Sequence, residues 1–300
     1  MITTPTIEYN IVEHCNLSCK NCDHASPFFP PTVIDCDSIA RDLCALAAVM
    51  HCGEVKIVGG EPLLHPDLTA VLAACRTSSV AERLTLATNG TLLHLMSEQC
   101  WASIDRLWLS IYPGVRIRLA AEELSELATR HGVQIDRIEM PAFRHTLLNG
   151  RNGDQQLVER IYAKCALRSL NWCHTVRAGR YYKCSPAPFV FSRPMLDDAT
   201  EELQDSVQLH DNPNLENDLR LYIDNSRPLK ACSYCLGSSG VRLAHRQMTR
   251  REIAAHSAAT ENINEMIDWT MLEGVSAPAE PPFFDFGRSA ITQYQHTHGS

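Results

Sequence analysis

The chain has 300 residues, 45% of them apolar, which allows one large α/β domain with a small appendage or two modest domains. Its formal net charge is −8 and no basic run or Lys/Arg stripe occurs, which argues against nucleic acid as a partner. The longest apolar stretch, residues 45–50, is too short to cross a bilayer, and the N-terminus lacks a secretion signal, so we expect a cytoplasmic protein without a membrane partner.

Strands alternate with helices along the first 140 residues. The predicted strands are 6–12, 54–58, 83–88, 106–112 and 133–140. The predicted helices are 37–50, capped by Asp37 or Ser38, then 66–75, 95–102 and 121–131, the last ended by Gly132. This alternation predicts an α/β fold with a parallel sheet and right-handed crossovers.

The second half of the chain has a different character. A helix is predicted over 155–163, and residues 174–184 read as a hairpin that turns at Ala178-Gly179. A polar stretch with several prolines then leads to Cys232 and Cys235, and short helices alternate with loops beyond them. We therefore expect three segments: 1–150, 151–245 and a helical or loop extension, 246–300.

Cysteine is unusually frequent, with 13 in the chain. A disulfide framework is typical of small secreted domains, whereas clustered thiols in a reducing compartment are more often metal ligands. Cys15, Cys19 and Cys22 follow the first predicted strand in a Cys-x3-Cys-x2-Cys pattern. Three thiolates in one loop would leave one iron of a [4Fe–4S] cluster open to a small molecule. A zinc loop is the alternative, but zinc sites usually take four ligands.

Two motifs resemble those of the radical S-adenosylmethionine (SAM) superfamily. Residues 15–22, Cys-Asn-Leu-Ser-Cys-Lys-Asn-Cys, resemble its cluster loop, and Gly59, Gly60, Glu61 and Pro62 resemble its GGEP motif. The resemblance implies that the open iron chelates the amino and carboxylate groups of SAM and that the GGEP segment hydrogen-bonds the amino group. The residue types suit this role, because glycines allow close backbone approach and a carboxylate accepts from an ammonium.

Three further residues resemble SAM-contacting positions of that family. Asn89 ends the third predicted strand and Ser110 lies in the fourth, where the family contacts the ribose or methionine end of SAM. A plain Asn-Gly turn and a serine at the core edge are the alternatives. Asn21 stands where the family usually has an aromatic residue against the adenine, which leaves the adenine packing open.

Four later cysteines resemble an auxiliary-cluster domain of the SPASM type in its truncated, twitch-like form. They are Cys165, Cys184, Cys232 and Cys235. The resemblance implies one auxiliary [4Fe–4S] cluster with four protein ligands. A structural zinc on the same residues and a partly open cluster that binds substrate are alternatives, and Cys173 could replace one ligand.

The combined resemblance implies a partial (β/α)6 TIM-like barrel over residues 1–150 and a small C-terminal auxiliary-cluster domain over 151–245. Within twitch-bearing enzymes, the spacing and chain length most resemble the aminocyclitol dehydrogenases of the butirosin pathway. This implies that reductive cleavage of SAM gives a 5′-deoxyadenosyl radical, which takes hydrogen from an alcohol carbon of a small sugar or aminocyclitol in natural-product biosynthesis. A flavodoxin or ferredoxin would donate the electron, and the auxiliary cluster would accept the one released by the substrate.

Other functions remain open at this point. A radical epimerase needs a hydrogen donor, for which Cys173 is the best candidate, and Arg144 is a weak candidate for contacting or deprotonating the substrate. A peptide-modifying radical SAM enzyme usually has a peptide-recognition domain before the cysteine triad; only 14 residues precede Cys15 here, so we expect such a domain to be absent or separate. A two-cluster electron-transfer protein would need no SAM, so the GGEP-like segment argues against it.

Overall fold

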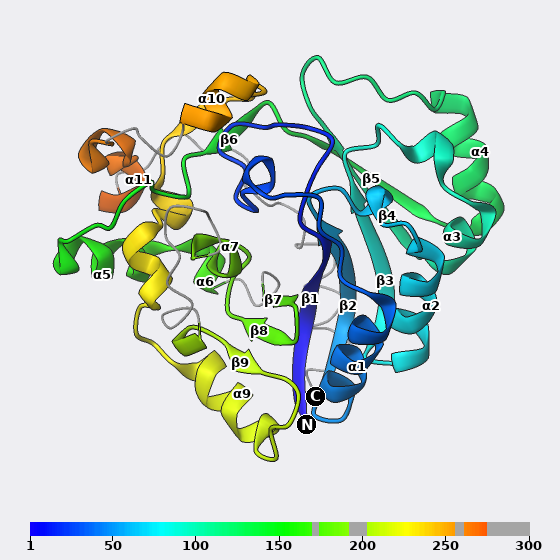
Figure 1. Ribbon diagram of the computed structural model, residues 1–300, viewed down its shortest axis with the longest axis horizontal. Coiled ribbons are helices and arrows are strands. Elements are labelled where there is room, and N and C mark those ends of the chain that lie inside the picture. Colours follow the sequence, from blue (N-terminus) through cyan, green and yellow to red (C-terminus); the bar gives the residue numbers. More distant parts are fainter. Residues whose placement is uncertain (170–173, 192–202, 256–260, 275–300) are drawn as a thin grey trace.

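A computed structural model describes residues 1–169, 174–191, 203–255 and 261–274 (Figure 1). Its centre is an eight-stranded sheet with the order β5-β4-β3-β2-β1-β7-β8-β9. The strands are β1 (Ile2–Val12), β2 (Met50–Gly59), β3 (Ala81–Thr88), β4 (Arg106–Ile111), β5 (Gln134–Glu139), β7 (Thr175–Arg177), β8 (Arg180–Tyr182) and β9 (Val207–Gln208). A separate antiparallel pair joins β6 (Ala142–Arg144) to β10 (Arg242–Ala244).

The first five strands pair in parallel, which confirms the predicted α/β fold with a largely parallel sheet. Four helices follow β1 to β4 in turn and lie on one side of the sheet (Figure 1). They are α1 (Cys36–Ala47), α2 (Leu68–Ser78), α3 (Glu98–Ser103) and α4 (Ala121–His131). The cap of α1 lies earlier than predicted, because the Asp35 side chain accepts from the backbone N–H of Ser38.

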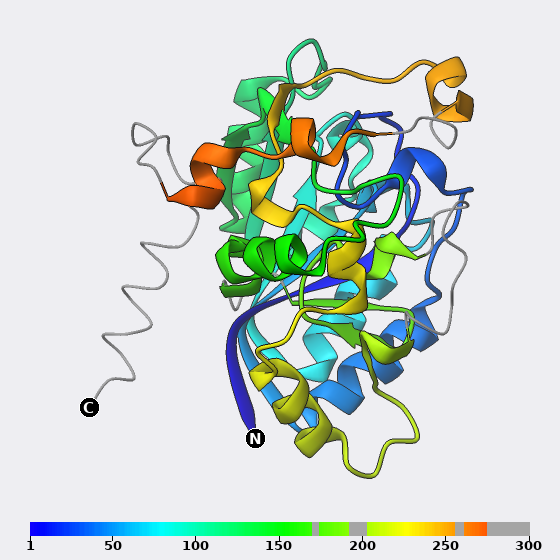
Figure 2. The same cartoon turned by 90° about the vertical axis from the view of Figure 1, so that its left-hand side faces the viewer.

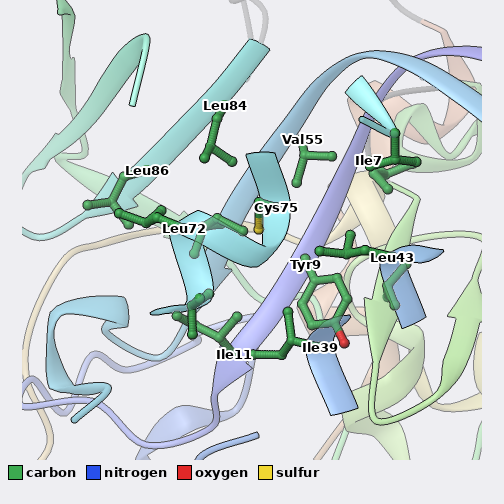
Figure 3. Packing of buried hydrophobic residues seen from close by; sticks show 14 of the residues in the cluster. Ile7, Tyr9, Ile11, Ile39, Leu43, Val55, Leu72, Cys75, Leu84 and Leu86 are labelled. Carbon is green, nitrogen blue, oxygen red and sulfur yellow. The ribbon is translucent and has the colours of Figure 1, made fainter. Parts of the chain in front are cut away.

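The main core lies between β1 to β4 and these helices. Ile7, Tyr9 and Ile11 alternate along β1 and are fully buried, and they pack against Ile39 and Leu43 of α1 (Figure 3). This alternation is the period-two pattern of a strand with one face on the helical layer. The intervening residues of β1 therefore point to the opposite face of the sheet.

Beyond residue 150 the chain returns to the same sheet. Strand β7 pairs in parallel with β1, with Thr175 opposite Glu8, and the predicted hairpin joins β7 to β8. Ala178 and Gly179 both have positive φ at its turn, as the favoured two-residue hairpin turns require. Strand β7 is thus the sixth parallel strand of the sheet and lies beside β1. The predicted domain boundary at residue 150 remains a prediction.

The remaining helices lie mainly on the other side of β1 (Figures 1 and 2). They are α5 (Gln155–Lys164), α6 (Ala166–Ser169), α7 (Ala187–Val190), α9 (Leu215–Asp224), α10 (Arg250–Ala255) and α11 (Trp269–Glu273). Short 3-10 helices are η1 (Ser26–Phe28), η2 (Pro62–Leu64), η3 (Leu93–Leu95), η4 (Lys230–Tyr234), η5 (Gly237–Ser239) and η7 (Ile263–Met266). Within the described ranges, no helix combines the length and apolarity that a membrane span requires.

Candidate functional site

A cavity of about 200 Å³ lies at the carboxyl ends of the central strands. Most of the residues predicted to hold the cluster and SAM line it. They are Cys15, Cys19, Asn21, Cys22, Gly59, Gly60, Asn89 and Ser110. Glu61 and Pro62 are buried beside the cavity without lining it. The carboxyl edge of a parallel sheet is where such folds collect their functional groups, so the position suits an active site.

The three cysteines lie on the loop between β1 and α1. Two N–H groups reach the sulfur of Cys15: the backbone N–H of Leu17 at 3.3 Å and the Asn89 side-chain amide at 3.6 Å. Burial raises the pKa of Cys15 to about 12 and that of Cys22 to about 11, and it also raises the pKa of Cys19. A bound iron reverses this preference, because a metal stabilises the thiolate. The donor set and the cavity therefore fit a metal cluster.

Gly59 and Gly60 run directly against the end of β1. A Cβ atom on Gly60 would lie 2.1 Å from the carbonyl oxygen of His14, and one on Gly59 would lie 2.3 Å from that of Val12. The Gly60 N–H donates to Val12 at 2.7 Å, and the Glu61 N–H donates to His14 at 3.1 Å. The glycines are thus needed for close packing against the chain's own backbone as well as for room beside a ligand.

The Glu61 carboxylate is fully buried and points to groups of its own chain. It accepts from the Thr88 hydroxyl at 2.6 Å, the Asn89 backbone N–H at 2.8 Å and the Leu63 N–H at 3.1 Å. Burial raises its pKa to about 7. The carboxylate therefore fixes the end of β3 relative to the turn after β2, and a direct contact from Glu61 to SAM remains a prediction.

Asn89 connects the end of β3 to the cluster loop. Its side-chain amide donates to the Asn16 side-chain oxygen at 2.8 Å, in addition to its contact with Cys15. Its own oxygen accepts from the backbone N–H and hydroxyl of Thr91. The position that sequence reasoning assigned to SAM contact thus also orients a proposed cluster ligand.

Three aromatic rings, which the sequence did not indicate, gather beside the cavity. The Tyr112 ring stacks on His245 at 4.9 Å between centroids and on Phe143 at 5.8 Å. Tyr112 and Phe143 line the cavity together with Asn21, the residue that stands in place of an aromatic one. The rings come from three separate segments. Tyr112 lies at the end of a predicted strand, but nothing in the sequence assigned it to the site.

The segment after β10 pairs with the cluster loop. The Lys20 N–H donates to the Arg246 carbonyl at 2.9 Å and the Met248 N–H donates to the Ser18 carbonyl at 2.7 Å. Both Figure 1 and Figure 2 place α10, which follows this segment, at the same end of the molecule as the loop after β1. Residues far apart in the sequence therefore complete the candidate cluster site.

The four auxiliary cysteines line a second, smaller cavity of about 40 Å³. Burial raises the pKa of Cys184 well above its usual value, and the nearby thiols of Cys235, Cys232 and Cys165 raise it further. Gly237 is required here, because its φ is +52° and an added Cβ would lie 2.6 Å from the Cys165 sulfur. The structure thus brings the four predicted ligands together, whereas Cys173 lies outside the described residues.

In the described part of the chain, no three His, Cys, Asp or Glu side chains are arranged to hold one metal ion. A cubane differs from one ion because each thiolate binds a different iron atom.

Arg144, the weak catalytic candidate, also lines the first cavity, where its Nη1 donates to the Gly240 carbonyl at 2.9 Å.

Comparisons with known proteins agree with the family that the two sequence motifs resemble. Residues 9–133 match the model of the Radical SAM superfamily. The chain is 31% identical over 109 residues to the GTP 3',8-cyclase of Lactiplantibacillus plantarum, a match that covers 35% of this chain and 32% of that protein. It is 28% identical over 169 residues to the S-adenosylmethionine-dependent nucleotide dehydratase of Selenomonas ruminantium, covering 50% and 59%. The chain thus spans about a third of the length of the cyclases that it matches.

Among solved structures, BtrN in complex with AdoMet and 2-DOIA gives a TM-score of 0.48 at 15% identity, covering 79% of this chain and 94% of that one. SuiB of Streptococcus suis bound to S-adenosylmethionine gives 0.36 at 21% identity, covering 45% and 33%.

Proposed function

We propose that this protein, whose residues 9–133 match the model of the Radical SAM superfamily, holds a [4Fe–4S] cluster on Cys15, Cys19 and Cys22 and cleaves SAM reductively. The observation that carries the proposal is the convergence of these cysteines with Gly59 and Gly60 on one cavity. The cluster with bound SAM would supply a 5′-deoxyadenosyl radical, the species that abstracts hydrogen.

The chain's own residues would hold and orient these groups. Leu17 and Asn89 direct N–H groups at the Cys15 sulfur, which fixes one ligand and partly offsets its charge. The Glu61 carboxylate accepts from the backbone N–H of Asn89, and this hydrogen bond holds the turn after β2 to the end of β3. Such pre-organisation is typical of a site that works by positioning the reacting atoms and not by general acid–base catalysis.

We further propose that the reaction oxidises an alcohol carbon of a small polar substrate, such as a sugar or an aminocyclitol. An auxiliary [4Fe–4S] cluster would supply an electron acceptor. Its position is supported by Ser185, which lines the first cavity, while the adjacent Cys184 lines the second. An external flavodoxin or ferredoxin in the cytoplasm would supply the electron for SAM cleavage.

The other reaction types have weaker support. A radical epimerase requires a thiol donor, and its candidate, Cys173, lies outside the described residues. Among the described residues that line the first cavity, the cysteines are the three proposed ligands. A nucleotide substrate is the second candidate, because the named relatives include a GTP cyclase and a nucleotide dehydratase.

The test compares wild-type protein with a variant in which Cys15, Cys19 and Cys22 are all replaced by Ala, both reconstituted anaerobically. We expect about eight irons per chain in the wild type and about four in the variant. We also expect 5′-deoxyadenosine from SAM and dithionite only in the wild type. Cys44→Ala, at an exposed thiol of α1, is the matched control. Undiminished 5′-deoxyadenosine formation by the triple variant would refute the proposal.

A further inference from the structure

The second cavity contains one cation beside its four thiols. Lys183 is the single Lys, Arg, Asp or Glu among the described residues that line it. The other lining residues are mostly apolar: Ile161, Tyr162, Leu167, Pro186, Leu229 and Gly237. Lys183 is only 6% exposed, although lysine is rarely buried and a buried charge is costly. A lysine in this apolar surrounding therefore needs an explanation.

The end of a helix holds the Lys183 side chain. Its Nζ donates to the Tyr222 carbonyl at 3.4 Å and to the Asn225 carbonyl. Tyr222 lies in the last turn of α9, and Asn225 directly follows that helix. The last carbonyls of a helix lack partners within it and carry a partial negative charge, which favours an ammonium group. The end of α9 thus fixes a positive charge beside the four thiols.

The backbone of Lys183 belongs to the frame around the auxiliary cysteines. Its N–H donates to the Tyr222 hydroxyl at 3.1 Å, and that hydroxyl donates to the Asp205 backbone carbonyl. The Asp205 carboxylate accepts from the backbone N–H groups of Lys230 at 2.8 Å and Ala231 at 2.6 Å. Both N–H groups belong to η4, the 3-10 helix that contains one of the four cysteines. Lys183 is therefore held in a fixed position relative to the proposed ligands.

The charge of Lys183 acts on the groups around it. At Cys232, burial raises the pKa to about 12 and the Asp205 charge raises it further, whereas the Lys183 charge lowers it. Across the hairpin, burial lowers the pKa of His174, and the Lys183 charge lowers it further. Coulomb interactions are stronger where apolar groups exclude water. A cluster bound by these cysteines would therefore experience the same positive charge.

A fixed cation beside an iron–sulfur cluster affects its two oxidation states unequally. One-electron reduction makes the cluster more negative, so a nearby positive charge stabilises the reduced state more than the oxidised state. Apolar surroundings strengthen this effect, because they lower the local dielectric constant. A lysine held at this place makes a cluster a better electron acceptor than an apolar residue would.

We propose that the Lys183 ammonium raises the reduction potential of the auxiliary [4Fe–4S] cluster and so favours electron transfer to it from the substrate radical. In that step a carbon radical bearing a hydroxyl group loses the hydroxyl proton to water and one electron to the cluster. A C=O group forms, and the cluster is reduced by one electron. The proposal rests on the proposed function, and it gives Lys183 an electrostatic role without a part in bond breaking.

A redox titration followed by EPR on the anaerobically reconstituted holoenzyme tests this role. Lys183→Gln keeps a donor for the α9 carbonyls but removes the charge, and Lys183→Met removes both. In each, the equilibrium constant for reduction of the auxiliary cluster should fall at least tenfold, which is about 59 mV for one electron. The first cluster should keep its potential. Lys183→Arg retains the charge, so its auxiliary cluster should stay close to the wild-type potential.

Lys164→Gln is the matched control. Lys164 directly precedes Cys165, as Lys183 precedes Cys184, but its side chain is exposed and water screens its charge. The control should therefore have the wild-type potential. A wild-type potential in a neutral Lys183 variant that holds the cluster would overturn the proposal. An equal shift in Lys183→Arg would do the same, because packing and not charge would then be responsible.

Iron content separates this proposal from the proposed function. Loss of the auxiliary cluster from both neutral variants, seen as about four irons per chain, would assign Lys183 a structural role and overturn the proposal. About four irons in the wild type would refute the auxiliary cluster itself, and the role of Lys183 with it. About eight irons with unshifted potentials would refute the role of Lys183 alone. Formation of 5′-deoxyadenosine in the same preparations shows whether SAM cleavage stands.

Discussion

The Nε2 atom of His245 lies 3.2 Å from the sulfur of Cys19. The ring is held by stacking on Tyr112 and by contact with Phe143, and the backbone beyond it pairs with the cluster loop. Hydrogen bonds to cluster sulfurs stabilise the reduced, more negative state and so raise the reduction potential. A residue more than 200 positions away in the chain thus contacts a proposed ligand of the first cluster.

His245→Phe should lower the midpoint potential of the first cluster. Phenylalanine keeps the stacking on Tyr112 but removes the ring nitrogen that contacts Cys19. A hydrogen bond of about 0.5–1.5 kcal/mol corresponds to roughly 20–60 mV for one electron. A redox titration followed by EPR measures the shift, with His94→Phe at an exposed histidine as the control. Equal potentials in both variants would mean that the ring only packs.

Gly60→Ala should prevent assembly of the first cluster. The new Cβ would lie 2.1 Å from the His14 carbonyl oxygen, so the turn after β2 and the cluster loop would have to separate. The expected result is about four irons per chain instead of about eight, with no 5′-deoxyadenosine formed. Gly153→Ala is the matched control, since nothing lies within 4 Å of its Cβ position. Normal iron content in Gly60→Ala would show that the loop can move at little cost.

Local patterns predicted much of the fold. The helix 121–131 and its ending at Gly132 match α4, because its capping and periodicity are encoded within the segment itself. The alternation of strands with helices likewise predicted the parallel pairing of the first five strands. The position of β7 beside β1 could not be predicted, because it depends on pairing between residues about 165 positions apart. The sequence of one segment does not specify which distant strand it pairs with, or in which register.

The sequence likewise predicted some residues of the candidate site and not others. Cys15, Cys19 and Cys22 are close in sequence, so their spacing was readable, and the structure brings them to one cavity. His245 and Phe143 carry no motif and reach the site only through the β6–β10 pair. Glu61 could be singled out from its GGEP-like motif, but its buried hydrogen bonds with Thr88 and Asn89 depend on tertiary packing and could not be predicted.

Glu61→Gln should destabilise the protein even without a cluster. The buried carboxylate accepts three hydrogen bonds, from Thr88, Asn89 and Leu63, and the NH2 group of a glutamine would place a donor against at least one of these donors. We expect a loss of about 1–3 kcal/mol in the free energy of unfolding. Urea unfolding of the apoprotein measures it, and Glu82→Gln, at a half-exposed carboxylate of β3, should change it by less than about 0.5 kcal/mol. Equal midpoints for the two variants would show that these bonds contribute nothing net.

Gly237→Ala should remove the auxiliary cluster alone. Alanine is strained at φ +52°, and its Cβ would lie 2.6 Å from the Cys165 sulfur. The expected iron content is about four per chain, with 5′-deoxyadenosine formation retained and the second EPR signal lost. Gly150→Ala, where the Cβ meets nothing within 4 Å, is the control. About one zinc and four irons in the wild type would instead favour a structural zinc at this site.

His174 should make the apoprotein less stable in mild acid. Its ring is buried and contacts the Tyr181 hydroxyl, and burial, helped by the nearby Lys183 charge, lowers its pKa to about 4. Between pH 6.5 and 4 the unfolded chain binds a proton that the folded chain does not, so stability falls as pH falls through this window. The loss is on the order of 3 kcal/mol and is absent above pH 6.5.

Urea unfolding of the apoprotein at pH 7.5, 6 and 5 tests this dependence, with His174→Asn as the variant. The variant should be less stable than the wild type at pH 7.5, because the contact with Tyr181 is lost. The two free energies should converge as pH falls, since the substituted asparagine side chain has no proton to gain. His94→Asn, at an exposed ring, should follow the wild type throughout. Parallel curves for His174→Asn and wild type would mean that the buried ring takes up its proton at its ordinary pKa.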